Sequence, residues 1–322
     1  MRLKRSRLTE PGLRRRAAGR GFTYIDADGA VVRDAGLRAR LETLPIPPAW
    51  TDVWICADEN GHIQAVGTDA AGRKQYLYHP VWRQRRDLDK FDRMVRFGAR
   101  LPAARRTVTR QLSQGGTGRT AVLAAAFRML DSTLIRVGGE QYAKSSGAVG
   151  LATVRRSAVV ACSGEVLALK FEGKSAIEHE LEVHDRALVS VVRRLVERDE
   201  KGDVELLAYD DGEGWRDVRS SDVNDHVRAT VGDEFTAKDF RTWHATVTAA
   251  AVLLDRGPQD SDRARRRVVS EAMQTAASRL GNTPAVARSS YVDPRLIEAY
   301  HRGVLLPTTR SAETIVRELL SP

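Results

Sequence analysis

Tyr291 has the clearest chemical potential in this sequence, because its neighbours hold the phenol between two short predicted helices. Thr283 is suited to cap the first helix and Pro284 to occupy its first position. Asp293 and Pro294 then begin the next helix, so Tyr291 is presented at a helix end instead of being packed within one. A tyrosine presented in this way can serve as a nucleophile. An ordinary half-buried aromatic residue is the alternative interpretation.

Cationic side chains elsewhere in the chain would suit an anionic substrate. Arg136 follows a predicted helix in TLIRVGGEQYAK, and Lys174 occupies the tight turn of FEGKSA. Lys238 and Arg241 are three residues apart in TAKDFRTWHA, so they share one helix face. Taken singly, each is more ordinarily a solvated charge. Together they meet the needs of transfer at a phosphodiester, where cations stabilise the phosphorane and an acid protonates the leaving oxygen.

In their order along the chain, these motifs resemble those of type IB DNA topoisomerases, in particular the short form found in poxviruses and bacteria. In that family a tyrosine attacks DNA, and a His or Asn lies nine residues before it. Here Asn282 lies nine residues before Tyr291. The resemblance covers nearly the whole chain and implies an enzyme that relaxes supercoiled DNA through a 3′-phosphotyrosyl intermediate, without ATP or metal.

The same resemblance implies a role for each of the other motif residues. Arg136 and Arg241 correspond to the arginines that bind the scissile phosphate. Lys174 corresponds to the general acid, and Lys238 to a lysine that assists in protonating the leaving group. Tyr142 corresponds to a tyrosine that touches DNA in the family.

Two N-terminal segments, PPAWTDVWIC and GRKQYLYHP, resemble the domain with which this family clamps DNA. The resemblance implies that the strand with Lys74, Gln75, Tyr76 and Tyr78 enters the major groove. Gln75 would pair with a base edge, while the tyrosines add stacking and phosphate contacts. A plain amphipathic strand is the alternative.

The sequence also departs from the family pattern. Val149 and Ala158 stand where many relatives carry Tyr and His, and Asn282 replaces the histidine of the viral enzymes. An amide can donate to a phosphate oxygen but cannot carry charge, so we expect this contact to be weaker. Two further histidines near the motifs, His179 and His244, are interpreted as structural.

The elements that must position these residues predict an α+β fold. We expect a flexible basic arm over residues 1–20, a β-rich DNA-clamping domain over 21–92 and a mainly α-helical catalytic domain over 93–322. Alternating residues between 157 and 184 predict a three-stranded antiparallel sheet within the catalytic domain. Helices are expected at about 96–112, 120–135, 185–199, 221–230, 236–254 and 258–280, and again from Ser311.

Composition limits the classes of function. The 322 residues carry a net charge of +10, which favours a polyanionic partner, double-stranded DNA above all. No apolar run approaches the ~18 residues of a membrane span. The two cysteines have no zinc-binding spacing and suit a reducing cytoplasm, where we expect a monomer acting on the nucleoid. SQGGTGRT fails the phosphate-loop pattern, and no cofactor is expected.

Two other functions remain open from the sequence. A tyrosine recombinase shares the catalytic chemistry but normally carries a histidine three residues before its second arginine, where this chain has Lys238. A DNA-binding protein without catalytic activity could retain the same scaffold. The presence of every required side chain argues against that second alternative.

Overall fold

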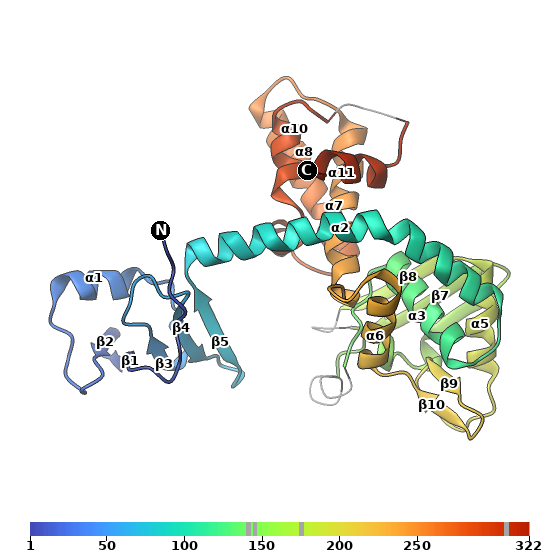
Figure 1. The fold of residues 1–322 in the computed structure, drawn as a ribbon, viewed down its shortest axis with the longest axis horizontal. Coiled ribbons are helices and arrows are strands. Elements are labelled where there is room, and N and C mark those ends of the chain that lie inside the picture. The colour runs from blue at the N-terminus through green and yellow to red at the C-terminus, as the bar shows by residue number, and fades with distance from the viewer. Residues whose placement is uncertain (140–142, 144–146, 174–176, 306–308, 322) are drawn as a thin grey trace. The chain divides into compact units, whose positions relative to one another are not determined.

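The computed structural model describes residues 1–139, 143, 147–173, 177–305 and 309–321, and it has the α+β fold predicted from the sequence (Figure 1). Its contacts divide the chain into two compact units, Met1–Phe91 and Asp92–Pro322. Each unit has its own hydrophobic core. We therefore describe the N-terminal unit and the C-terminal unit separately.

The N-terminal unit is a five-stranded antiparallel sheet with one helix. Its strands follow the spatial order β2-β1-β3-β4-β5. Helix α1 packs through Leu41, which is buried and whose carbonyl accepts a hydrogen bond from the Tyr24 hydroxyl at 3.2 Å. The elements are β1 (Leu13–Ala18), β2 (Gly21–Ile25), α1 (Ala35–Thr43), β3 (Thr51–Ile55), β4 (Ile63–Thr68) and β5 (Lys74–Tyr78).

The prediction of a flexible arm over residues 1–20 is wrong, because β1 lies inside this sheet, paired with β2 and β3. Leu13 is buried in the core. The Arg15 guanidinium lies 4.0 Å from the centre of the Phe22 ring and donates to backbone carbonyls of the loop before β3. The basic composition indicated an arm, whereas strand pairing and this one arginine order the segment.

Helix α2 (Pro80–Ser113) is much longer than the helix predicted at about 96–112. It begins directly after β5, and the division between the two units falls within it. Its first turns carry charges of alternating sign, such as Lys90 and Asp87, whose Nζ and carboxylate lie 3.2 Å apart. Pairs at this spacing support a helix with few apolar residues.

The C-terminal unit contains the predicted three-stranded sheet, with β6 (Val159–Ser163), β7 (Val166–Glu172) and β8 (Glu178–His184) in sequence order. A short hairpin of β9 (Ala208–Asp210) and β10 (Trp215–Asp217) was not predicted. Its signal was an Asp-Gly turn before a tryptophan, which a helical reading of the region overlooked.

Most helices of the C-terminal unit pack around α7, which is buried along most of its length. Phe240 and Trp243 of α7 lie in the core, where the Phe240 ring makes edge contacts with Phe97 and Phe127. The helices are α3 (Arg119–Thr133), α5 (Arg186–Glu197), α6 (Ser220–Val231), α7 (Ala237–Arg256), α8 (Asp262–Leu280), α9 (Pro284–Ser290), α10 (Pro294–His301) and α11 (Ala312–Leu320). Most of them match the predicted helical segments within a few residues.

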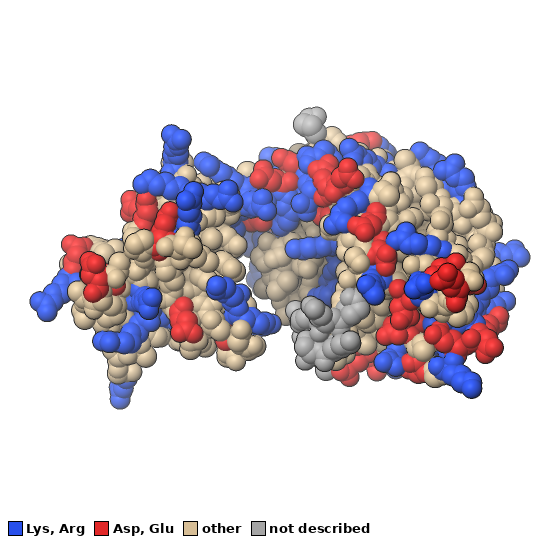
Figure 2. Space-filling view, turned by 60° about the horizontal axis from the view of Figure 1, so that its bottom comes forward, with Lys and Arg blue, Asp and Glu red and all other residues tan. Residues whose placement is uncertain are grey.

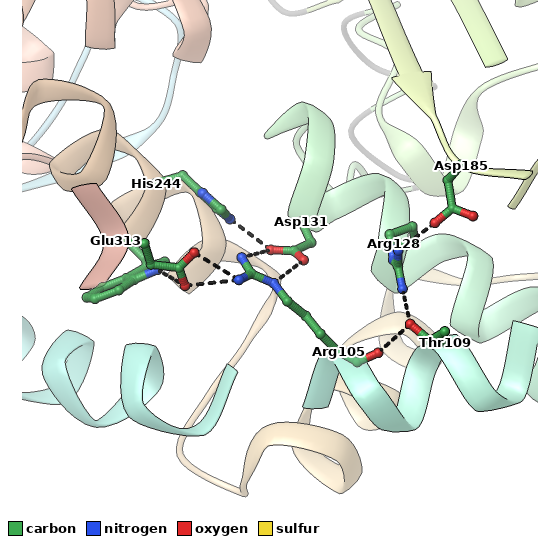
Figure 3. A network of polar contacts seen from close by, with 8 residues as sticks. Arg105, Thr109, Arg128, Asp131, Asp185, His244 and Glu313 are labelled. Carbon is green, nitrogen blue, oxygen red and sulfur yellow. Dashed lines mark hydrogen bonds and ion pairs between the residues drawn. The ribbon is translucent and has the colours of Figure 1, made fainter. Parts of the chain in front are cut away.

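A polar network joins α2, α3, α7 and α11 (Figure 3). The Arg105 guanidinium binds both oxygens of Asp131, at 2.7 and 2.9 Å, and both oxygens of Glu313, at 3.0 and 2.9 Å. His244 Nε2 lies 2.8 Å from Asp131 Oδ1, so this histidine has the structural role predicted for it. Because Arg105 satisfies two carboxylates at once, it fixes the C-terminal helix α11 against the rest of the unit.

Positive charge is distributed widely over the surface. On the face drawn in Figure 2, Lys and Arg side chains lie on both units and are interspersed with acidic ones. The excess charge is therefore not confined to a terminal arm. Within the described residues, no helix combines the length and apolar character that crossing a membrane requires.

Asp131 makes a pH-dependent contribution to stability that can be measured. Burial opposes its charge, but hydrogen bonds from His244 and Arg105 lower the pKa of Asp131 to about 2, against 3.8 for an ordinary aspartate. A depressed folded pKa gives stability that is present above the unfolded pKa and lost as pH falls through the folded pKa. We expect Asp131→Asn to lower the free energy of unfolding by roughly 2 kcal/mol at pH 7.

Urea unfolding of the full chain at pH 7, 4 and 2.5 measures this difference, which should be nearly unchanged at pH 4 and shrink below it, as the pH falls toward the folded pKa. Asp225→Asn is the control, since Asp225 pairs with Arg228 on the surface and its loss should change the unfolding free energy by under about 0.5 kcal/mol. Equal stability losses for the two variants would contradict the structural role of the network.

Candidate active site

Arg241 is the centre of the candidate site and is almost fully buried, with 4% of its surface exposed. It lies on the second turn of α7, whose start is fixed by Thr236 and Asp239: the Thr236 backbone N–H donates to the Asp239 carboxylate at 2.7 Å. This is the capping interaction expected from the sequence. Asp239 is itself buried and paired with Arg93 at 2.8 Å.

The Arg241 guanidinium binds the carboxyl ends of two other helices. Its Nη1 donates to the carbonyl of Leu134, the residue that ends α3, and its Nη2 donates to the carbonyl of Leu280, the last residue of α8, at 2.7 Å. Carbonyls at a helix end lack intrahelical partners and carry partial negative charge, so they favour a cation. Arg241 is thereby held in place without a carboxylate partner among the described residues.

The next two residues of the site follow shortly after those two helix ends. Both α3 and α8 end in a left-handed residue, Leu134 and Gly281, after which the chain turns toward Arg241. Arg136 and Asn282 each lie two positions after the residue whose carbonyl Arg241 binds. Arg136 Nη2 donates to Asn282 Oδ1 at 2.8 Å, so two residues 146 positions apart in sequence are in direct contact.

Two buried donors in this group lack hydrogen-bond partners. Within the described part of the chain, neither Arg241 Nε nor Asn282 Nδ2 makes a hydrogen bond. An unpaired buried donor costs about 1–3 kcal/mol, and more when it is charged, so such groups mark sites that bind a ligand. Burial and the neighbouring Arg136 lower the pKa of Arg241 to about 10. The arrangement is suited to an anion with several oxygens.

Tyr291 lies at the end of α9, as predicted, with its ring beside this cationic group. The Thr283 hydroxyl caps α9 through Val286 N, and Tyr291 N donates back to Ala287 O at 3.0 Å. The Tyr291 carbonyl accepts from the Thr246 hydroxyl at 3.3 Å, so α7 also holds the backbone of this tyrosine. The Arg241 guanidinium carbon lies 5.6 Å from the centre of the tyrosine ring.

The electrostatic environment favours ionisation of Tyr291. Partial burial acts against the phenolate, but the positive charges of Arg241, Arg136 and Lys238 outweigh it, and the pKa of Tyr291 lies below its ordinary value of 10. Lys238 itself is exposed on the first turn of α7. A lowered pKa makes the hydroxyl a better nucleophile at neutral pH.

The structure thus brings together five of the predicted catalytic residues, while two predicted residues cannot be placed. Lys174 and Tyr142 lie outside the described residues. Gly173, directly before Lys174, is described and packs against the ring of His179. Burial lowers the pKa of His179 most, and the positive charges of Arg136 and Arg241 lower it further. The β7–β8 connection therefore begins close to the site.

The predicted DNA-contacting residues of β5 divide between its two faces. Lys74, Tyr76 and Tyr78 alternate as exposed residues, and the two tyrosine rings stack with centres 6.1 Å apart. Gln75 belongs to the other set, which is half-buried, and its amide donates to the Asp69 carboxylate at 2.9 Å. The exposed face is therefore a lysine with two tyrosines, and Gln75 must leave Asp69 before it can reach a base.

Family models match both units of the chain. One for the catalytic core of eukaryotic DNA topoisomerase I matches residues 79–303, and one for the N-terminal domain of bacterial DNA topoisomerase IB matches residues 21–69. The chain belongs to the type IB DNA topoisomerases. This family of isomerases was the one indicated by the sequence motifs, and the match extends over most of the chain.

Viral relatives agree with this assignment. DNA topoisomerase 1B of Acanthamoeba polyphaga mimivirus is 29% identical over 297 residues, which cover 91% of this chain and 88% of the viral protein. DNA topoisomerase 1 of rabbit fibroma virus (strain Kasza) is 23% identical over 310 residues, covering 90% and 93%. DNA topoisomerase 1B of vaccinia virus (strain Copenhagen) is 27% identical over 148 residues, covering 45% and 47%.

The contribution of Arg241 to the acidity of Tyr291 can be tested directly. Arg241→Gln removes the largest favourable charge but leaves the ring partly buried, so we expect the pKa of Tyr291 to rise above its wild-type value. Titration of protein labelled with ¹³C at the tyrosine ζ carbon measures this, and the resonance is assigned by its absence in Tyr291→Phe.

Arg256→Gln is the matched control, because Arg256 pairs with Glu271 on the surface and has no contact with the tyrosine. Its titration curve for Tyr291 should coincide with that of the wild type. An unchanged Tyr291 pKa in Arg241→Gln would show that the arginine does not govern the ionisation.

Proposed function

We propose that this topoisomerase relaxes supercoiled duplex DNA by transient cleavage of one strand, with Tyr291 as the nucleophile. The observation that supports this best is the buried Arg241, which has an unpaired Nε and no carboxylate partner among the described residues, beside the unpaired amide nitrogen of Asn282 and a tyrosine of lowered pKa. A phosphodiester supplies the missing negative charge and the hydrogen-bond acceptors in one group. The tyrosine then lies beside the phosphate it is to attack.

In the proposed reaction the Tyr291 oxygen loses its proton to solvent water and forms a bond to phosphorus, while the bond from phosphorus to the 5′-oxygen breaks. Arg136 and Arg241 stabilise the charge on the non-bridging oxygens, and Asn282 donates a further hydrogen bond. Lys174, assisted by Lys238, gives a proton to the departing 5′-oxygen. The product is a 3′-phosphotyrosyl bond and a free 5′-hydroxyl.

Religation is the same sequence in reverse, with the 5′-hydroxyl attacking and Tyr291 leaving. The phosphotyrosyl diester replaces one phosphodiester with another, so the reaction needs no energy from ATP, and the arginines take the charge-stabilising role that a metal could otherwise have. Between the two steps the broken strand swivels and supercoils are lost. We further propose that a monomer in the cytoplasm clamps nucleoid DNA through the N-terminal unit, using Lys74, Tyr76 and Tyr78.

A plasmid relaxation assay tests this function. With EDTA and without ATP, the wild-type protein should relax both negatively and positively supercoiled plasmid, and denaturant should trap a protein joined to a 3′ DNA end. Tyr291→Phe should bind DNA normally but show no relaxation and no covalent complex, because it lacks the attacking oxygen. Tyr300→Phe, which alters a buried tyrosine bonded to Gly257 O, should remain active. Relaxation by Tyr291→Phe near the wild-type rate would exclude the proposed nucleophile.

The role of Lys174 is tested with a leaving group that needs no proton. Lys174→Ala should slow cleavage of ordinary DNA by about 10²–10⁴-fold, the usual contribution of general acid catalysis. A bridging 5′-sulfur leaves as a thiolate, so it should restore cleavage by Lys174→Ala to nearly the wild-type rate. Arg241→Ala should gain no comparable rescue, because its role is to stabilise charge. Equal rescue of both variants, or of neither, would contradict this division of roles.

A further inference from the structure

His179 lies beside the candidate site but has no role in the reaction described above. It is the second residue of β8, opposite Phe171 of β7, and the two rings stack with centres 5.4 Å apart. The imidazole is half-buried. Its flanking residues Glu178 and Glu180 are exposed and pair with Lys170, so they lie on the other face of the strand.

The imidazole is packed tightly against the backbone of two glycines. A methyl group at Gly173 would lie 2.5 Å from His179 Cδ2 and 2.6 Å from Nε2, distances that side chains do not adopt. A methyl group at Gly281 would lie 3.0 Å from Cε1. The ring therefore fills the space between two backbone segments that come from distant parts of the sequence.

These two segments carry catalytic residues. Gly173 is the first residue after β7 and directly precedes Lys174, while Gly281 is the first residue after α8 and directly precedes Asn282. Gly281 belongs to a fixed helix end, because the carbonyl just before it binds Arg241. The β7–β8 connection, by contrast, is closed by a hydrogen bond from Gly173 N to Ile177 O at 2.8 Å. The imidazole of His179 adds a second contact, which links Gly173 to the end of α8.

The charges around the ring place it within the same site. Burial, then Arg136 and Arg241, lower the pKa of His179, so it is neutral at pH 7. Among the described residues, the charged groups that act on it are these two arginines, from the segment after α3 and from α7. An uncharged ring can pack here without adding a third cation to the phosphate pocket.

We propose that His179 is a positioning residue for the general acid: its imidazole joins the backbone of Gly173, directly before Lys174, to the end of α8 and so holds the start of the segment that carries the general acid. This inference rests on the function proposed above. Misplacing a catalytic group by about 1 Å can slow a reaction by about 10²-fold. The contact joins backbone atoms to the imidazole ring, so the proposed role depends on the shape of the side chain.

Single-turnover cleavage of a DNA duplex by the full-length protein is the first measurement. His179→Ala should cleave bound DNA about 10–100-fold more slowly than the wild type, with DNA affinity within about threefold. His179→Gln, which lacks the ring, is a second variant and should behave likewise. Because the rate is taken from bound enzyme, a loss of folded molecules lowers only the amplitude. Wild-type rates in both variants would overturn the proposal.

A double-mutant cycle then tests the contact itself. Gly173→Ala should also slow cleavage, because the new methyl group must displace the imidazole. In the Gly173→Ala/His179→Ala double variant that space is free, so its rate should lie within about threefold of His179→Ala alone. Gly118→Ala, where a methyl group meets open space, is the control and should cleave normally. If the rate losses of the two single variants multiplied in the double variant, the proposed contact between Gly173 and His179 would be contradicted.

The bridging-sulfur substrate identifies the group through which His179 acts. If the imidazole positions Lys174, sulfur should reduce the defect of His179→Ala to under about threefold. An equal defect on both substrates would show that His179 acts elsewhere and would overturn the inference. A wild-type protein that forms no covalent complex would instead disprove the proposed function, so the two failures are distinguishable.

Discussion

The two hydrogen bonds from Arg241 to the ends of α3 and α8 are the constraint on which this active site depends. One rigid guanidinium bonds to the carbonyls of Leu134 and Leu280, and the residues two positions beyond each carbonyl are Arg136 and Asn282. A displacement of α7 would therefore move all three residues. A lysine at this position could not replace it, because an ammonium lacks the planar fork that reaches both carbonyls and still directs Nε elsewhere.

The same constraint explains why the charge of Arg241 is left without a carboxylate partner among the described residues. A neighbouring aspartate would stabilise the buried cation but would also neutralise the field that lowers the pKa of Tyr291 and attracts a phosphate. Helix-end carbonyls offer a weaker compensation, which holds the arginine while leaving most of its charge available. Carboxylates are used instead about one turn further along α7, where His244 contacts Asp131 and Arg105 binds both Asp131 and Glu313 (Figure 3).

The sequence was sufficient to predict features that depend on local patterns. The α+β class, the three-stranded sheet, the cap of α7 and the position of Tyr291 between two short helices all follow from periodicity and capping residues. Features that depend on contacts distant in sequence could not be derived in this way. The bond between Arg136 and Asn282, the packing of His179 against two glycines, and the ordering of β1 by Arg15 all join segments whose proximity no local pattern encodes.

The alternation of side chains along β5 can be read from the sequence. The prediction instead followed a family motif that treats Gln75 and the tyrosines as one DNA-contacting unit. Successive strand residues point to opposite faces, so Gln75 cannot share a face with Tyr76. In the structure it bonds to Asp69, whose carboxylate also accepts from Arg73. To recognise a base, Gln75 would thus have to release the Asp69 carboxylate and bind DNA instead, whereas Lys74 and the tyrosines already face outward.

The contact between Arg136 and Asn282 also gives a reason for the asparagine. Arg136 can only donate, so it binds the amide oxygen and thereby fixes the amide nitrogen as the free group, with both of its hydrogens available to a phosphate. A histidine at this position could accept from Arg136 and donate to the phosphate only as a neutral ring of one tautomer. Two arginines nearby would favour that neutral form. The asparagine therefore supplies, at any pH, the donor geometry that a histidine would supply only when uncharged, but it cannot add positive charge as the phosphorane forms.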